Sequence, residues 1–274
     1  LLETAEAARG VAEQAAEALA PFEQLVLLGA PAPVSFFAYP DKESWLTPEA
    51  CELIMLAEAS EDLDGTISAL AEALGVTGAP TRLQTRQRHE IDDEALTPMT
   101  LGQVLSNELP EQAIVCDEGA TCGLAIYLLT EQAEAHDWLT LTGGAIGQGL
   151  PLALGASLAC PDRKVVALEA DGSAMYTIQA LWSMAREQTD VTVVLLNNRS
   201  YAILNIELGR VGAGEPNAKT LSMLDLSNPD MSYASIAEGL GVRATQARTS
   251  AEFAEQFHDA MRTPGPCLIE ALLA

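Results

Sequence analysis

The stretch that decides the fold is Val165-Val-Ala-Leu-Glu-Ala-Asp171-Gly-Ser173, followed by a helical run and then by Val191-Thr-Val-Val-Leu-Leu-Asn-Asn198. Its two apolar runs are bounded by turn residues, which predicts two buried strands. In a strand–helix–strand unit of a parallel sheet, both strands end at the same edge. Asp171 and Asn198, which are 27 residues apart, are therefore expected to lie together.

The residue types at this edge suit a metal-bound phosphate. Gly172 lets the backbone approach a ligand closely, and the turn opens a helix with free N–H groups. These N–H groups and the Ser173 hydroxyl suit a phosphate. A carboxylate, an amide oxygen and a main-chain carbonyl form an incomplete set of hard oxygen ligands, which Mg²⁺ prefers when phosphates complete it. The sequence thus predicts a Mg–diphosphate site rather than an ordinary unit with polar loops.

An Asp-Gly-Ser turn followed after 27 residues by Asn-Asn resembles the signature of thiamine diphosphate (ThDP) enzymes. The family pattern begins with Gly-Asp-Gly, whereas this chain has Ala170 in the first position. The resemblance implies three metal ligands, namely the side chains of Asp171 and Asn198 and the carbonyl of Ser200. It also implies cofactor contacts from Thr121, Gly172, Ser173 and Tyr201. For Thr121, a helix N-cap is an equally good interpretation.

A second glycine-rich segment, Thr142-Gly-Gly-Ala-Ile-Gly-Gln-Gly149, follows a predicted strand and opens a predicted helix. A dinucleotide fingerprint fails here, because the glycine required after Gly147 and Gly149 is replaced by Leu152. In the resemblance to ThDP enzymes, the Gly144 carbonyl accepts a hydrogen bond from the aminopyrimidine. Ile146 then lies under the cofactor and enforces its bent conformation, and core packing is the alternative for this side chain.

The resemblance extends to particular branches of the family. Residues 144–151 and 174–182 are similar to acetolactate synthase large subunits, and residues 198–204 are similar to benzoylformate decarboxylase. Ile203 and Leu204 would present aliphatic surface to the substrate, or else form the buried face of a helix. The implied activity is decarboxylation or carboligation of a 2-oxo acid, and the sequence does not choose between them. It also leaves an FAD requirement open.

The family also requires a glutamate beside the cofactor pyrimidine, which lies in a separate pyrimidine domain. We expect a missing segment or a partner chain to supply it, within a homodimer or homotetramer. The sequence starts at Leu1 inside a predicted helix, so we expect a fragment or a chain whose earlier part is missing. The alternative from another class is a non-catalytic cofactor-binding or regulatory subunit.

Composition sets outer bounds on the function. The 274 residues are 49% hydrophobic and carry a net charge of −25. This charge argues against nucleic-acid and anionic-membrane partners. Five cysteines without a C-x-x-C pair favour a reducing compartment, the cytoplasm. No apolar run reaches the length of a membrane span, and no signal peptide is visible.

Alternation of strands and helices predicts an α/β fold with a doubly wound parallel sheet. We expect residues 97–274 to form the ThDP diphosphate- and Mg-binding domain. By resemblance, residues 1–78 look like the C-terminal part of a middle α/β domain. The basic run at residues 81–89 places a linker at residues 79–96.

Overall fold

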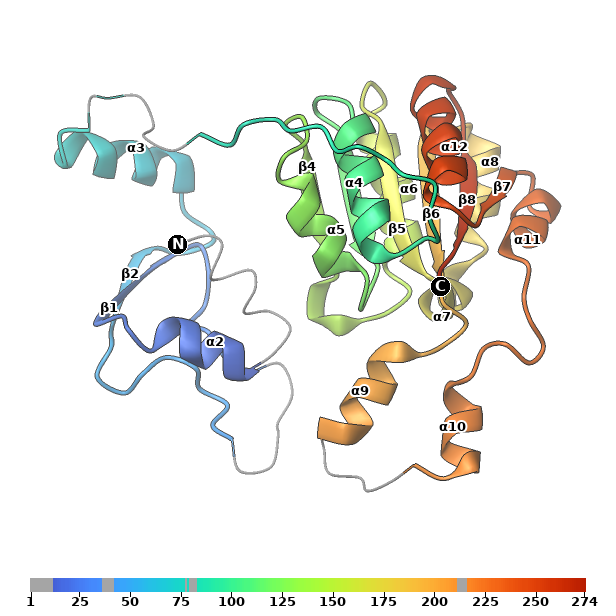
Figure 1. The fold of residues 1–274 in the computed structure, drawn as a ribbon. Coiled ribbons are helices and arrows are strands. Elements are labelled where there is room, and N and C mark those ends of the chain that lie inside the picture. The colour runs from blue at the N-terminus through green and yellow to red at the C-terminus, as the bar shows by residue number, and fades with distance from the viewer. Residues whose placement is uncertain (1–11, 36–41, 77, 79–82, 211–215) are drawn as a thin grey trace. The chain divides into compact units, whose positions relative to one another are not determined.

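The computed structural model describes the chain except for residues 1–11, 36–41, 77, 79–82 and 211–215 (Figure 1). The chain divides into two compact units, residues 1–83 and 84–274. Each unit has its own sheet.

The first unit is a small α/β element. Its described helices and strands are α2 (Ala12–Leu19), β1 (Gln24–Leu28), β2 (Glu52–Ala57) and α3 (Leu63–Ala73). The two strands are parallel neighbours. The Asp62 side chain caps α3 by accepting the N–H of Gly65 at 2.9 Å, which satisfies one of the free donors of the first turn.

The second unit is built on a parallel sheet of 6 strands flanked by helices. Its elements are α4 (Pro98–Glu108), β3 (Ile114–Glu118), α5 (Gly123–Thr130), β4 (Asp137–Thr140), η1 (Thr142–Gly144), α6 (Gly149–Ala159), β5 (Val165–Ala170), α7 (Asp171–Thr177), α8 (Ala180–Glu187), β6 (Val191–Asn197), α9 (Ala202–Arg210), α10 (Ala218–Leu224), α11 (Tyr233–Gly239), β7 (Arg243–Ala247), α12 (Ser250–Arg262) and β8 (Cys267–Leu272).

The strand order is β4-β3-β5-β6-β8-β7, and every pairing is parallel. The chain leaves β3 to add β4 on one side and then returns to add β5 on the other side. The direction of winding therefore reverses between β3 and β5. In open α/β sheets, ligands bind outside the carboxyl ends of the strands at such a switch point.

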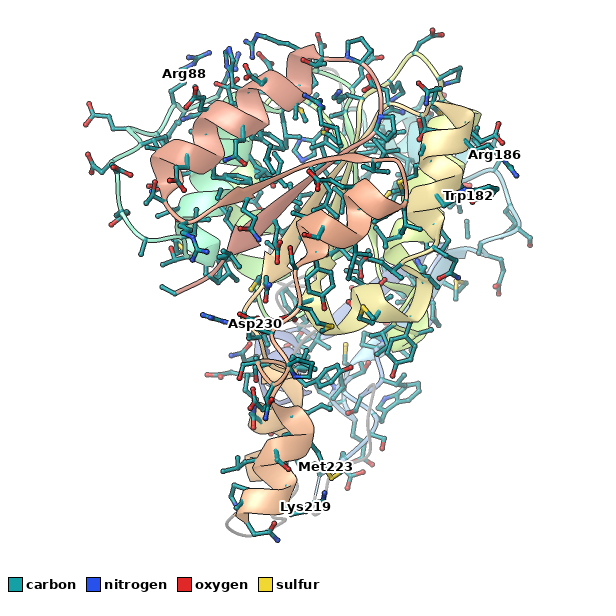
Figure 2. The ribbon with its side chains drawn as sticks, turned by 90° about the vertical axis from the view of Figure 1, so that its right-hand side faces the viewer. Arg88, Trp182, Arg186, Lys219, Met223 and Asp230 are labelled. Carbon is teal, nitrogen blue, oxygen red and sulfur yellow. The ribbon has the colours of Figure 1, made fainter. Side chains whose placement is uncertain are left out.

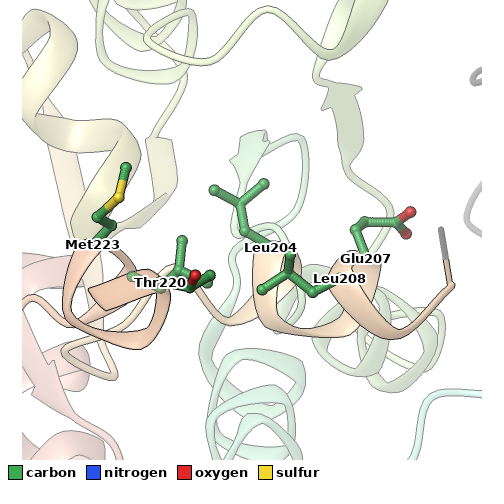
Figure 3. Close-up of a pocket in the computed structure, with 6 residues that line it drawn as sticks. Leu204, Glu207, Leu208, Thr220 and Met223 are labelled. Carbon is green, nitrogen blue, oxygen red and sulfur yellow. The ribbon is translucent and has the colours of Figure 1, made fainter. Parts of the chain in front are cut away.

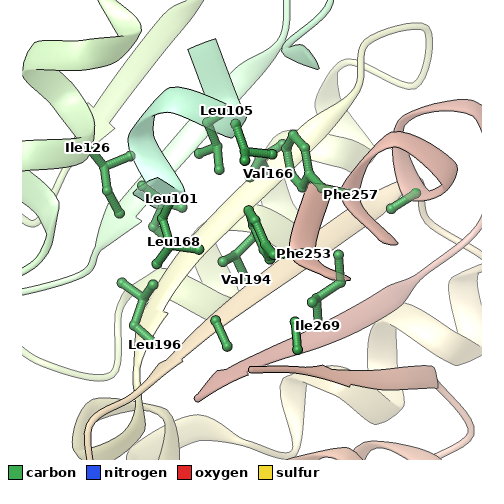
Figure 4. Close-up of a cluster of buried hydrophobic side chains, with 14 of the residues drawn as sticks. Leu101, Leu105, Ile126, Val166, Leu168, Val194, Leu196, Phe253, Phe257 and Ile269 are labelled. Carbon is green, nitrogen blue, oxygen red and sulfur yellow. The ribbon is translucent and has the colours of Figure 1, made fainter. Parts of the chain in front are cut away.

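Helices cover both faces of this sheet, and each face has its own apolar core. On one face, α4, α5 and α12 pack Leu101, Leu105, Ile126, Phe253 and Phe257 against the strands (Figure 4). On the other face, α6, α7, α8 and α11 bury residues that include Leu150, Leu181, Met184 and Tyr233. Strands buried on both faces read as continuous apolar runs, as in β5 and β6. The predicted doubly wound α/β fold is confirmed.

Residues 84–96, which sequence analysis assigned to a linker, lie along the second unit. The main-chain N–H of Gln87 donates to Gln132, and the Asn107 amide makes two hydrogen bonds to the backbone of His89, each 2.9 Å. Leu96 is fully buried and its N–H donates to Arg248. This segment, which includes part of the basic run, is therefore held by hydrogen bonds to its main chain.

The surface of the second unit carries ordinary solvent-facing contacts. On α8, the Arg186 guanidinium lies 5.1 Å from the ring centre of Trp182, and both side chains project outward (Figure 2).

Across the described part of the chain, no helix combines the length and the apolar character needed to cross a membrane.

Candidate functional site

Acidic side chains form a row across the sheet, at or near the carboxyl ends of β3, β5 and β8. Glu118 on β3 pairs in register with Glu169 on β5, and Glu169 pairs with Leu195 on β6. Leu195 in turn pairs with Glu270 on β8. The three glutamates are almost fully buried. Charged residues are rarely buried without dedicated partners, so this row marks the carboxyl edge as a functional candidate.

Asp171 follows β5 directly and begins α7. Its carboxylate accepts the N–H of Gly172 at 2.8 Å and the N–H of Arg199 at 2.6 Å. Burial raises the pKa of Asp171, and these N–H groups act in the opposite direction. The contact with Arg199 joins the ends of β5 and β6, as the spacing in the sequence predicts.

The loop after β6 has a defined shape. Asn198 accepts the N–H of Ser200 through its Oδ1 atom at 2.9 Å, and Arg199 has a φ of 56°. Ser200 pairs with Asp225 in an isolated bridge, flanked by hydrogen bonds at Arg199 and Tyr201. Within the described residues, no main-chain N–H donates to the Ser200 carbonyl. This carbonyl and the second lone pair of Asn198 Oδ1 are therefore available to a cation.

Three of the predicted diphosphate contacts, Gly172, Ser173 and Tyr201, lie at the turn that Asp171 begins. A methyl group added to Gly172 would lie 2.3 Å from Cε1 of Tyr201, so the ring covers this turn closely. Ser173 is buried and its hydroxyl donates to Glu169 at 2.9 Å, which turns it toward the sheet. Its main-chain N–H is the remaining group for a phosphate. Thr121 lies in the loop after β3, and the N-cap of α5 is Cys122, so the N-cap interpretation of Thr121 is not met.

The glycine-rich segment forms an arch between β4 and α6. Gly143, Gly144 and Gly147 have positive φ values, a conformation that favours glycine. The arch exposes Gly144 and leaves 42% of Ile146 accessible, so the core-packing alternative for Ile146 is not met. Thr177 on α7 donates its hydroxyl to the Gly147 carbonyl at 2.9 Å. The arch therefore contacts the helix that Asp171 begins.

Two residues that the sequence analysis overlooked sit beneath this arch. The Glu118 carboxylate accepts the N–H groups of Gly147 and Gly149. Glu169 is fully buried, and its Oε2 has no hydrogen-bond partner in the part of the chain that the structure describes. Burial, together with the charge of Glu118, raises the pKa of Glu169 well above its ordinary value. The sequence does hold one signal for Glu169, because an acidic residue inside an apolar strand is unusual and indicates a special role.

Glu270 and Tyr233 were overlooked as well. Glu270 accepts the Asn197 amide at 2.8 Å, and the Tyr233 hydroxyl donates to the Asp171 carbonyl at 2.7 Å. Asn197 in turn accepts the N–H of Arg199 at 3.2 Å. These contacts brace the two turns that carry Asp171 and Asn198. Tyr233 could not be found from the sequence, because its partner is 62 residues away.

The two residues predicted to face the substrate lie on α9, and both are exposed. Leu204 lines a hollow of about 260 Å³ between α9 and α10 (Figure 3). Its other lining residues are mostly aliphatic or have long side chains, namely Glu207, Leu208, Thr220, Met223 and Leu224. Ile203 does not line this hollow, so only one of the two side chains faces it. Because both side chains are exposed, neither forms the buried face of a helix, which was the alternative interpretation.

The donor set fits a hard cation that carries phosphates. The Asp171 carboxylate and the Asn198 amide oxygen lie on the turns after β5 and β6, which the hydrogen bond from Arg199 to Asp171 joins, and the Ser200 carbonyl belongs to the second of these turns. Magnesium is bound in proteins by such sparse oxygen sets when phosphates supply further ligands. In the described residues, no group of three or more His, Cys, Asp or Glu side chains is placed to hold a metal by itself.

Comparison with known proteins identifies the family of the chain. Residues 119–271 match the family described as thiamine pyrophosphate enzyme, C-terminal TPP binding domain. A Mycobacterium tuberculosis protein named IlvX, assigned to the acetolactate synthase large subunits, is 49% identical over 263 residues, which are 96% of this chain and 51% of that protein. Benzoylformate decarboxylase of Pseudomonas aeruginosa is 31% identical over 76% of this chain and 39% of its own length.

A solved structure is similar as well. The ThDP-dependent 4-hydroxybenzoylformate decarboxylase of Rhodococcus jostii superposes with a TM-score of 0.72 and 27% identity, over 92% of this chain and 49% of that protein. This chain thus spans about half the length of these relatives, or less. Thiamine pyrophosphate and thiamine diphosphate are two names for one cofactor. The chain belongs to the thiamine pyrophosphate enzymes, and it carries the C-terminal TPP binding domain of that family.

Proposed function

We propose that this chain binds ThDP through Mg²⁺ and forms the diphosphate half of an active site for 2-oxo acids. The reaction is decarboxylation, carboligation, or both. The observation that carries the proposal is the buried Asp171 carboxylate at the end of β5, which is hydrogen-bonded to the loop after the neighbouring strand β6. The names of the similar proteins, acetolactate synthase and benzoylformate decarboxylase, support the substrate class.

In this proposal, the metal is held by Asp171, Asn198 and the Ser200 carbonyl. The N–H groups at the start of α7, with Thr121 and Tyr201, face the diphosphate. The hydrogen bonds to Gly172 and Arg199 keep the Asp171 carboxylate in one orientation, so little reorganisation is needed when a cation arrives.

When bound, ThDP supplies the electron sink that stabilises a carbanion at the substrate carbonyl carbon. The chain contributes orientation of that reactive end. Gly144 would offer its carbonyl to the aminopyrimidine, and Ile146 would support the bend of the cofactor from the exposed side of the arch. Both residues project from a segment that α7 and β3 hold in place.

Substrate contacts are proposed for α9. Ile203 and Leu204 present aliphatic surface, which favours an apolar substituent on the 2-oxo acid. The glutamate that acts on the pyrimidine is proposed to come from a pyrimidine-domain segment or a partner chain, within a homo-oligomer.

The test is a calorimetric titration of ThDP into the chain with Mg²⁺, and again with a chelator in its place. We expect Asp171→Ala to weaken Mg-dependent ThDP binding by more than about 100-fold, because it removes the one anionic ligand of the proposed metal site. Asp171→Asn keeps the size of the side chain and removes its charge, so it is expected to weaken Mg-dependent ThDP binding similarly. Its N–H₂ group would face one of the two N–H donors, so circular dichroism of the variant checks that the fold is retained.

Asp137→Ala is the matched control. This aspartate begins β4, is exposed, and pairs with Arg163 at 2.6 Å. Its removal should leave ThDP affinity unchanged. Unaltered ThDP affinity in both Asp171 variants would show that the metal is held elsewhere and would refute the proposed site.

A further inference from the structure

Glu118 makes a contact across the site that its position on β3 does not explain. It is 2% exposed, and its two carboxylate oxygens accept the N–H groups of Gly147, at 2.5 Å, and of Gly149. The donors lie 29 and 31 residues further along the chain, so β4 stands between them and Glu118 in the sequence. The carboxylate therefore holds the end of the glycine arch onto the end of β3.

Further contacts at Thr142, Gly147 and Gly149 fix the arch at both of its ends. Gln148 Oε1 accepts the hydroxyl of Thr142 at 2.6 Å and also its N–H at 3.2 Å. A methyl group on Gly147 would lie 2.8 Å from the Tyr176 Cβ, and one on Gly149 would lie 2.3 Å from Glu169 Oε2. Neither glycine has room to shift toward its neighbours. Gly144 and Ile146, between these anchors, remain exposed.

Two N–H groups can be satisfied by a neutral acceptor, which costs less free energy to bury than the charged carboxylate of Glu118. A neutral acceptor would serve in a purely structural turn, whereas a buried carboxylate loses its hydration before its hydrogen bonds are counted. Glu169 lies beside it in register, which adds to the cost. Hydrogen bonds to a charged acceptor are about twice as strong as neutral ones, and they hold donors in a narrower geometry.

We infer that Glu118 is a positioning residue of the cofactor site, which fixes the arch so that Gly144 and Ile146 meet the reactive end of ThDP. This inference rests on the proposed function. According to this inference, different residues of the site act on different parts of ThDP. The turns at Asp171 and Asn198 would bind the metal and diphosphate, while Glu118 would govern only the part of the cofactor beyond the diphosphate.

The experiment compares two probes, ThDP and inorganic pyrophosphate, each titrated with Mg²⁺ into the 274-residue chain and its variants. Glu118→Gln keeps the size of the side chain but turns an N–H₂ group toward an N–H donor, and Glu118→Ala removes both acceptors. We expect each to weaken ThDP binding by about 10-fold or more, since two buried donors lose a charged acceptor. Pyrophosphate affinity should change by less than about 2-fold, because its ligands lie on other turns.

Glu111→Gln is the matched control, because this exposed glutamate precedes β3 and its replacement should change neither affinity. Equal losses for ThDP and pyrophosphate would mean that Glu118 supports the whole edge, which overturns the inference. An unchanged ThDP affinity in the Glu118 variants would also overturn the inference. So would equal affinities of ThDP and pyrophosphate for the unsubstituted chain. Failure of the unsubstituted chain to bind either probe would instead refute the proposed function.

Amide NMR gives a second readout that needs no cofactor. The Gly147 and Gly149 amide protons should resonate downfield in the unsubstituted chain, as expected for hydrogen bonds to a carboxylate. In Glu118→Gln, both resonances should move upfield and exchange faster with solvent, while the Gly172 amide stays in place. Unmoved resonances would overturn the inference even in a variant whose ThDP affinity falls.

Discussion

Gly149 and Gly155 occupy the same helix, α6, but a methyl group added at each would meet opposite surroundings. At Gly149 it would lie 2.3 Å from Glu169 Oε2 and 2.9 Å from the Glu118 Cβ, whereas nothing lies within 4 Å at Gly155. We expect Gly149→Ala to lower the free energy of unfolding by about 1–3 kcal/mol through overpacking. Gly155→Ala should raise it by up to about 1 kcal/mol through helix propensity.

Urea denaturation of the two variants and the unsubstituted chain measures both effects. Both variants make the same substitution in the same helix, but Gly149 is the first residue of α6 and Gly155 lies in its interior, so the gain in helix propensity applies mainly to Gly155. Equal shifts for the two variants would show that the tight contact at Gly149 relaxes freely.

At the residue scale, the sequence predicted the side chains whose position follows from the end of a strand. Asp171 and Asn198 were placed this way, and the hydrogen bond between Asp171 and Arg199 brings their turns together. Glu118 and Glu270 were missed, because a carboxylate in a strand reveals nothing about its partners. Those partners come from Gly147 and from Asn197, which the topology of the sheet brings near.

At the scale of elements, strands were easier to predict than helix breaks. The apolar runs of β5 and β6 lie where the sequence indicates. The helix expected after Asp171 is instead two helices, since α7 ends at Thr177 and α8 begins at Ala180. No glycine or proline marks the break. The Thr177 hydroxyl donates to the Gly147 carbonyl there, a tertiary contact that local sequence does not encode.

The Tyr233 hydroxyl on α11 donates a buried hydrogen bond to the Asp171 carbonyl on α7. Tyr233→Phe keeps the ring and leaves that carbonyl without its donor. We expect a loss of about 1–3 kcal/mol in the free energy of unfolding. Tyr176→Phe, at a ring that is 60% exposed, is the control and should stay within about 0.5 kcal/mol.

Thermal or urea unfolding followed by circular dichroism distinguishes the two tyrosines. A Tyr233→Phe variant as stable as the unsubstituted chain would indicate that water or a shifted side chain replaces the hydroxyl.

At the scale of the whole molecule, the five cysteines are free and differ in access. Cys116, Cys122 and Cys267 are buried, while Cys51 and Cys160 are half-buried. Burial raises the pKa of the Cys116 thiol to about 12, so it stays protonated and unreactive well above pH 9. We expect a maleimide reagent to label Cys51 and Cys160 in the native chain and all five thiols in denaturant.

Mass spectrometry of the labelled peptides assigns each modification. Replacing Cys51 and Cys160 with serine should remove the native labelling and leave the slow, unfolding-limited reaction of the other three. Rapid labelling of Cys116 at pH 9 would contradict its place in β3.

The division of the chain was only partly open to prediction. The alternation of strands and helices indicates a doubly wound sheet, and the second unit has one. The basic run around Arg86 gave no sign of its hydrogen-bonded path from Gln87 to Leu96. Extended segments held by main-chain bonds leave little pattern in their side chains, so composition alone suggests a free linker there.

The strand order also sets a sequence of events during synthesis. β8 lies between β6 and β7 but leaves the ribosome after both of them. Until it emerges, β7 has no neighbour in the sheet, and Asn197 lacks the Glu270 carboxylate that orients it. The nascent chain can therefore fold the layer from β3 to β6 before the loop after β6, which we propose to hold the metal, is set. Cofactor capture becomes a late step, and it cannot guide the folding of the strands made earlier.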